Sequence, residues 1–223
     1  MHFFSEEYLN FFKELAANNH KDWFDSNRKR YEENVKSPFH LFVSELITAV
    51  SQVDSDIHIE AKDAIFRINR DIRFSKDKTP YKLFSSAIVS KYGKADKSYP
   101  GMYLEMGPEA FTIYGGVYMP AKEEIEKIRR EIHDNLQAFN QIIEEDKFKS
   151  MFGTVQGDRF KKVPPTFAET FKLQPLVLNK QWYHFATLEP RTILRSDLME
   201  ITLEHFKVAL PFQNFMNKAL NNS

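Results

Sequence analysis

Residues 66–74 combine an alternating apolar pattern with dense charge, and this restricts what the chain can fold into more than any other stretch. Phe66, Ile68, Ile72 and Phe74 occupy alternate positions, and the residues directly between them are polar. A period of two is typical of a strand that buries one face. The pattern therefore predicts a half-buried strand over these residues.

Arg70 breaks the alternation, because it takes the apolar position between Ile68 and Ile72. A guanidinium group keeps its proton, so a buried one needs a carboxylate or several acceptors beside it. We therefore expect Arg70 either to form a structural ion pair or to line a site from within. Glu105, on a later predicted strand, is a candidate partner.

Positive charge is concentrated in residues 67–82, where the predicted strand is followed by a loop over Ser75–Pro80. This stretch holds six basic and two acidic residues, although the whole chain has a formal net charge of zero. Arginine forks suit carboxylate and phosphate oxygens, and lysines add point charge. We predict an anion-binding site in which Tyr81 stacks on or hydrogen-bonds to the ligand. Its residues are Arg67, Arg70, Asp71, Arg73, Lys76, Asp77, Lys78, Tyr81 and Lys82.

Three functions are compatible with this charged stretch. The first is the binding, with or without chemical processing, of a molecule that carries phosphate or carboxylate groups. The second is nucleic-acid binding through the same patch extended by Lys91, Lys94 and Lys97, which the sequence pI of about 7.1 makes the weaker alternative. The third is a structural or protein-interaction role, with the charges forming an internal ion-pair network. The sequence does not decide between an enzyme and a binding protein.

Familiar catalytic and metal-binding motifs are missing from the sequence. The chain has no Cys, which excludes disulfides, thiolate catalysis and Cys-based zinc sites. Its seven His residues form neither His-x-His nor His-Glu-x-x-His. We predict no metal site and no cofactor. Asp71 and Asp77 are the best acid–base candidates, but neighbouring cations would keep them ionised and suit them better to ion pairs.

Apolar residues at helical spacing predict N-terminal helices that begin after Ser5 and continue over 21–36 and 39–53. Residues 57–61 read as a short strand, and residues 102–106 and 111–118 as a hairpin. Gly115-Gly116 predicts a bulge or a close backbone approach. Later helices are expected from Pro120 and from Ser196, the last one interrupted at Pro211.

These elements predict an α+β fold. A central, mostly antiparallel or mixed sheet would be packed by N-terminal, middle and C-terminal helices. No linker of domain-separating composition occurs, so we expect one domain over residues 1–223. The first residues lack a basic region ahead of an apolar stretch, and no apolar segment is long enough to span a membrane. Together with the missing cysteines, this leads us to expect a cytoplasmic protein with no membrane partner.

Several motifs carry a resemblance to a known family. The strongest is the run Arg67-Ile68-Asn69-Arg70-Asp71 with Arg73-Phe74-Ser75-Lys76-Asp77-Lys78-Thr79-Pro80-Tyr81-Lys82, supported by Trp23-Phe24, Pro100-Gly101, Gly115-Gly116 and Lys162-x-Pro164-Pro165. Through them the chain resembles a family of bacterial and fungal proteins catalogued as a domain of unknown function, number 2461. The family usually has Gly where this chain has Thr166. The resemblance covers nearly the whole chain and implies a single-domain member, without an activity, cofactor or catalytic residue.

Overall fold

The computed structural model describes residues 1–96 and 98–221. Within them, four strands form one antiparallel sheet in which each strand pairs with the next one along the chain. The strands are β1 (Ser85–Ser90), β2 (Gly101–Met106), β3 (Phe111–Val117) and β4 (Trp182–Leu188). The predicted α+β fold and the predicted hairpin, which is β2–β3, are confirmed.

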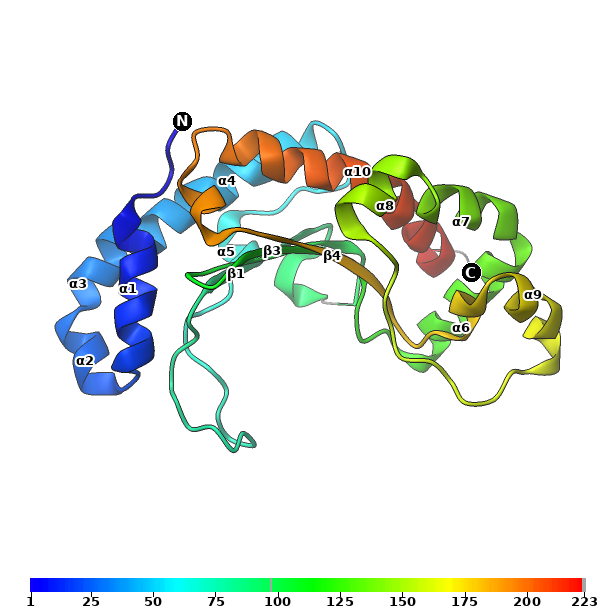
Figure 1. Ribbon diagram of the computed structural model, residues 1–223, viewed down its shortest axis with the longest axis horizontal. Helices are drawn as coiled ribbons and strands as arrows, with labels where there is room; N and C mark the ends of the chain where they lie inside the picture. Colours follow the sequence, from blue (N-terminus) through cyan, green and yellow to red (C-terminus); the bar gives the residue numbers. More distant parts are fainter. Residues whose placement is uncertain (97, 222–223) are drawn as a thin grey trace.

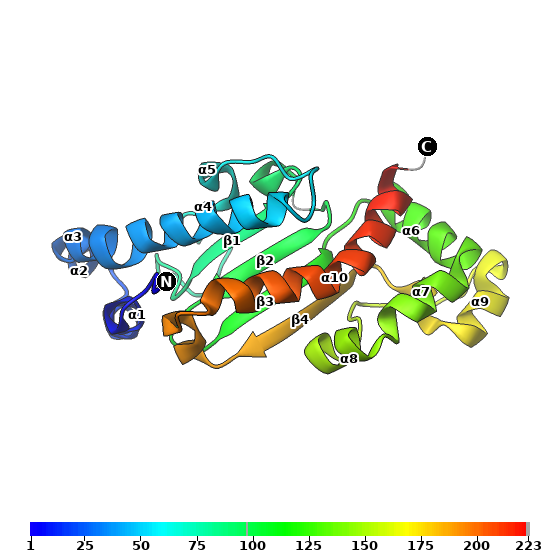
Figure 2. The same cartoon turned by 90° about the horizontal axis from the view of Figure 1, so that it is seen from above.

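Two long helices, α4 (Ser37–Ser51) and α10 (Leu198–Asn221), lie side by side across one face of this sheet (Figure 1, Figure 2). That face is apolar because the inward positions of the strands carry residues such as Ala87, Leu104 and Ile113. We call the opposite face the open face. In the part of the chain that the structure describes, a short helical turn appears below the strands in Figure 1, but Figure 2 shows that it lies beside the edge of the sheet and not across this face.

The N-terminal helices pack at one end of the sheet (Figure 1). Here α1 presents its predicted apolar stripe to the core. The helix expected over 21–36 is divided at Asn27 and ends in a π-helical segment that leads into α4. These elements are α1 (Glu6–Ala17), α2 (Lys21–Ser26), α3 (Arg28–Tyr31) and η1 (Glu32–Lys36).

Two short helical turns, α5 (Ala61–Ala64) and η2 (Gly93–Ala95), pack beside the edge strand β1. The strand predicted over residues 57–61 is therefore wrong. Glu60 is extended and stands directly before the first turn of α5, and its N–H donates a hydrogen bond to the Asp63 carboxylate. Helix capping determines the conformation of this segment, because its few apolar residues are too sparse to form a strand or helix pattern.

The remaining helices gather at the other end, around the C-terminal half of α10 (Figure 2). The predicted interruption at Pro211 is wrong: α10 continues through it, and Figure 2 shows the helix bent rather than ended. Buried neighbours such as Phe206 and Phe212 hold both halves against the core. The elements at this end are α6 (Lys122–Asp134), α7 (Leu136–Ile143), α8 (Asp146–Phe152), α9 (Ala168–Leu173), η3 (Pro165–Phe167) and η4 (Pro175–Leu178). The remaining turn, η5 (Pro190–Leu194), lies at the N-terminal end, where His2 hydrogen-bonds to the Leu194 carbonyl.

The buried apolar residues form two clusters that meet at the sheet. One lies beneath α1 and α4, and the other lies among α6, α7, α8 and α10. Strand β3 contributes Ile113 to the first and Val117 to the second, and α10 contributes Phe206 and Phe212 in the same way. The two ends of the molecule are thus tied together by shared elements. A fully buried phenylalanine is worth about 1.5–3 kcal/mol, so this connection is strong.

Gly116 shows why glycine is needed on β3. Its φ is +98°, and a Cβ atom there would lie 2.3 Å from the carbonyl oxygen of Trp182 on β4. Strand pairing continues through this residue in register, so no bulge forms. Of the two outcomes predicted for Gly115-Gly116, the structure shows the close approach.

The described helices include none that combines the length and the apolar character needed to cross a lipid bilayer.

Candidate functional site

The charged motif forms an arm, residues 66–84, that projects from the sheet on the side of the open face (Figure 1). Its two sides are joined by backbone hydrogen bonds, from Arg70 N–H to Pro80 O and from Lys82 N–H to Ile68 O, both 2.9 Å. Only an isolated bridge between Asn69 and Tyr81 pairs them as strands would. The predicted half-buried strand over residues 66–74 is therefore wrong.

The predicted strand does not form because an alternating pattern indicates only which side chains are buried. A strand also needs a neighbouring strand to pair with, and the pattern does not show whether one is present. Ile68 and Ile72 are half-buried, as the pattern requires, but Phe74 is 95% exposed at the far end of the arm. Pro80 has no N–H, so the returning side of the arm cannot donate a hydrogen bond at that position. The motif is consequently an irregular projection and not part of the sheet.

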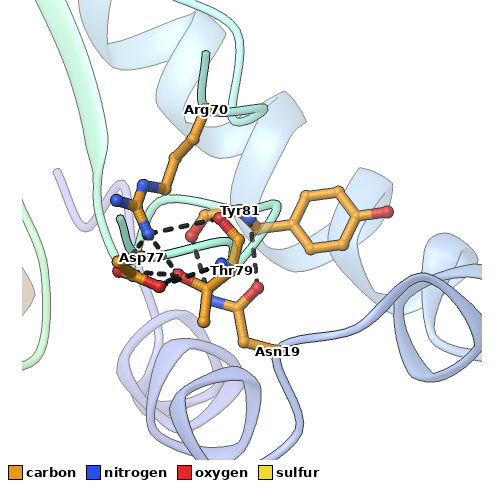
Figure 3. A network of polar contacts seen from close by, with 5 residues as sticks. All are labelled: Asn19, Arg70, Asp77, Thr79 and Tyr81. Atoms are coloured by element: carbon orange, nitrogen blue, oxygen red, sulfur yellow. Dashed lines mark hydrogen bonds and ion pairs between the residues drawn. The ribbon is translucent and has the colours of Figure 1, made fainter. Parts of the chain in front are cut away.

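Arg70 holds the arm closed by a set of contacts that we call the clasp (Figure 3). Its Nη1 donates to Asp77 Oδ2 at 2.5 Å, to Thr79 O at 3.2 Å and to the Thr79 hydroxyl. Asp77 in turn accepts from Thr79 N–H at 2.9 Å. Of the two roles expected for Arg70, the structure shows the ion pair. Its partner is Asp77 and not Glu105.

Both aspartates of the motif are engaged within the arm. The Thr79 N–H, followed by the Arg70 guanidinium, lowers the pKa of the Asp77 carboxyl to about 2. Arg73 donates to both oxygens of Asp71, at 2.9 and 2.7 Å, and its guanidinium lowers the pKa of that carboxyl to about 2. Both carboxylates therefore stay ionised at neutral pH and cancel the charges of their partners.

Three exposed cations of the arm lack such a partner. Arg67, Lys76 and Lys78 form no ion pair with any described residue. Lys78 Nζ donates to the backbone oxygen of Ile72 at 2.9 Å, which fixes its position without neutralising its charge. Most of the excess positive charge predicted for the motif is thus carried by these three exposed side chains.

Tyr81 belongs to the core. Its ring is 6% exposed and stacks on Phe24, with centroids 4.1 Å apart and planes 18° from parallel. The Asn19 amide hydrogen-bonds to both the N–H and the C=O of Tyr81, at 3.1 and 2.9 Å. Figure 3 shows the ring pointing away from the Arg70 guanidinium. Tyr81 therefore anchors the arm, and the ligand contact expected of it does not fit this position.

Lys82 connects the base of the arm to the open face. Its Nζ lies 3.4 Å from Ser86 Oγ on β1 and 5.3 Å from the centre of the Phe66 ring. Phe66 packs edge-on against Tyr103 of β2, with ring centroids 5.8 Å apart. The cationic arm and the sheet surface are therefore one continuous region.

The open face carries a row of three aromatic rings, which we call the aromatic row: Tyr103, Tyr114 and Phe185. They occupy directly opposed positions on β2, β3 and β4. Their centroids are 5.8 and 5.7 Å apart along the row. Beside it, the carboxylate of Glu105 accepts a hydrogen bond from the Tyr103 hydroxyl at 3.0 Å.

The tyrosine hydroxyls of this row stay protonated. Burial, reinforced by the Glu105 carboxylate, raises the pKa of Tyr103 far above its ordinary value. The same two causes raise the pKa of Tyr114. Both groups therefore act as neutral hydrogen-bond donors on the open face, next to a carboxylate acceptor.

The lysines proposed to extend the patch do not reach the arm. Lys91 pairs with Asp56 at 3.1 Å, and Lys94 Nζ donates to the backbone oxygens of Lys62 and Ile65. Both follow β1 at the end of the strand opposite to the arm. Lys97 lies outside the described residues.

Two hollows of the molecule lie away from the arm. One of about 610 Å³ is lined by residues of α7, α8 and α10, and one of about 640 Å³ lies between α7 and Leu173. Neither is lined by an arm residue. Within residues 1–96 and 98–221, no group of three or more His, Asp or Glu side chains is arranged to hold a metal ion.

The aromatic row is the part of the site that sequence reasoning missed. The signal was available in the alternation of β2, β3 and β4, where Tyr103, Tyr114 and Phe185 fall at outward positions. What could not be read was that the three strands are neighbours in this register, and that no helix covers them.

Fold and site together define an α+β protein whose antiparallel sheet is covered by helices on one face and joined to a cationic arm on the other. The chain belongs to the family described as Conserved hypothetical protein (DUF2461), whose model matches residues 7–215. Comparisons with curated proteins and with solved structures gave no match.

Proposed function

We propose that the arm binds an anionic ligand that carries phosphate or carboxylate groups. The observation that supports this is the separation of charges within the motif. Asp71 and Asp77 neutralise Arg73 and Arg70, while Arg67, Lys76 and Lys78 stay exposed. No described carboxylate forms an ion pair with these three side chains, so their positive charge remains available to a ligand.

The exposure of these cations indicates what kind of anion suits them. A single exposed ion pair contributes only about 0.2–1 kcal/mol, because water screens the charges and the side chains lose freedom. Arg67, Lys76 and Lys78 would therefore hold a ligand well only if several anionic groups engage them together. We infer a ligand with multiple charges that lies along the arm, in preference to a small metabolite enclosed in a pocket.

Titration calorimetry with inorganic polyphosphate tests the proposal. The double variant Lys76→Ala/Lys78→Ala should bind several-fold more weakly than the native protein, and its affinity should depend less steeply on salt. The matched control is Lys161→Ala/Lys162→Ala, which removes two exposed lysines from a segment outside the arm. It should bind as the native protein does.

Two results would contradict the proposal. One is the absence of polyphosphate binding by the native protein at low salt. The other is an equal loss in the arm variant and in the control, which would show that binding follows overall charge and not the arm.

A further inference from the structure

Aromatic side chains on the open face are exposed where polar ones are usual. An antiparallel sheet with one solvated face normally alternates apolar residues inward and polar residues outward. Here Phe185 is 41% exposed, and Tyr103 and Tyr114 are partly exposed. Three adjoining rings at these outward positions favour a contact with another molecule.

The geometry of the aromatic row suits flat ligand groups. The rings follow one another at 5.8 and 5.7 Å, tilted by 43° and 39°, across three hydrogen-bonded strands. Strand pairing fixes the spacing of the three residues, so the rings are held side by side. Such a surface offers planar partners a face to stack on with little loss of conformational freedom.

We propose that the open face stacks the bases of a single-stranded nucleic acid whose phosphates are held by the arm. This inference rests on the proposed function, because it identifies the anionic ligand of the arm. Combining a cationic track with aromatic side chains on which bases stack is the usual physical basis of single-strand binding. Exposed aromatics on an antiparallel sheet serve RNA-binding domains in the same way.

The contacts between arm and sheet favour this occupant. Lys82 at the base of the arm lies over Phe66, and Phe66 packs against Tyr103, the first ring of the row. A strand whose phosphates follow the arm would thus bring its bases to the row. Glu105, beside the row, adds an acceptor for the amino groups on base edges.

Fluorescence anisotropy with labelled single-stranded DNA and RNA about 12 nucleotides long tests the inference. The decisive comparison is an oligonucleotide of equal length that has no bases. The normal oligonucleotides should bind at least tenfold more tightly than the abasic one. Duplex DNA, whose bases are already stacked, should bind more weakly than the single strands.

Substitutions in the aromatic row test whether it causes the tighter binding of normal over abasic oligonucleotides. Phe185→Ala and Tyr114→Ala should each weaken single-strand binding roughly tenfold and leave abasic binding unchanged. Tyr114→Phe, which keeps the ring, should bind normally. Tyr92→Ala is the matched control and should also bind normally. It removes a ring about as exposed as Phe185, at the end of β1 that lies away from the arm. Melting temperatures of all variants check that each one folds.

The outcomes separate the two proposals. Equal affinity for normal and abasic strands, or equally tight binding of polyglutamate, would overturn base stacking while leaving anion binding by the arm intact. If polyphosphate, abasic strand and normal strands all fail to bind at low salt, both proposals fail.

Discussion

The Arg70 guanidinium and the Asp77 carboxylate meet across the arm, with Nη1 2.5 Å from Oδ2, although the two residues are seven positions apart in the chain. Thr79 joins the pair by donating its N–H to the same carboxylate. The contact closes the turn that carries Lys76 and neutralises one of the charges that make the motif conspicuous. Arg70 therefore shapes the arm, and the arm in turn exposes other cations of the motif, such as Lys76.

We expect Arg70→Met to open the clasp at a modest cost in stability. The Asp77 side chain is 59% exposed, so losing its partner returns a carboxylate to water instead of leaving it buried. The free energy of unfolding should fall by about 1 kcal/mol, not by the 3–5 kcal/mol typical of a broken buried pair. Urea denaturation measures this change.

The same variant should loosen the arm locally. Limited trypsin digestion followed by mass spectrometry should show faster cleavage after Lys76 and Lys78 than in the native protein. Arg73→Ala, which removes the other ion pair but leaves the clasp, serves as the control and should be cut at the native rate. Unchanged cleavage in Arg70→Met would show that the clasp does not order the arm.

Asn19→Ala should destabilise the protein by about 1–3 kcal/mol. The Asn19 amide satisfies both the N–H and the C=O of Tyr81, and the substitution leaves these partly buried groups without their partner. Asn18→Ala, which removes only an exposed contact to the Glu14 carbonyl, should cost less than 1 kcal/mol. Equal costs in urea denaturation would show that the Asn19 contact does not anchor the arm.

Gly116→Ala should be more damaging than Gly153→Ala, although both glycines have positive φ. At Gly116 the new Cβ would collide with the Trp182 carbonyl, whereas at Gly153 nothing lies within 4 Å. We expect a loss of about 1 kcal/mol at Gly153 from backbone strain alone, and at least 2 kcal/mol at Gly116. Thermal unfolding of the two variants gives the comparison, and similar losses would argue against a steric role for Gly116.

His184 should make the protein sensitive to mild acid. Burial, with a smaller effect of nearby His205, lowers the pKa of the His184 imidazole to about 3. The folded state therefore keeps this group neutral, while the unfolded chain gains a proton below a pH of about 6.5. Stability should be unaffected at pH 7 and should fall by up to about 1.4 kcal/mol per pH unit below pH 6.5, until the folded pKa is reached.

Denaturation of the native protein and of His184→Leu between pH 7 and pH 5 checks this expectation. The variant should show a shallower dependence on pH, whereas His40→Leu, at an exposed position, should keep the native slope. Asp71 and Asp77 do not interfere, because their pKa values of about 2 place their effect in stronger acid. Identical slopes for His184→Leu and the native protein would contradict the assignment.

Predictions from the sequence were correct where the spacing of apolar residues within one element is enough to determine its secondary structure. The stripe of α1 and the hairpin β2–β3 formed as predicted, because helical spacing and alternation each fit one kind of element. The predictions failed where a second element decides the outcome. Residues 66–74 alternate as a strand would, but only Phe66, whose N–H donates to Ser86 O of β1, lies beside a strand of the sheet. Pro211 stays inside α10 because packing on both sides compensates for the hydrogen bond that proline cannot make.

Composition and local pattern by themselves determined that cations gather in residues 67–82 and that the chain mixes helices with an antiparallel hairpin. Only the tertiary structure decided which cations are neutralised, that Tyr81 is buried, and that Tyr103, Tyr114 and Phe185 form a row. The physical reason is that charge and period are properties of neighbouring residues in the chain. Ion pairing, burial and strand register depend instead on residues that only folding brings together.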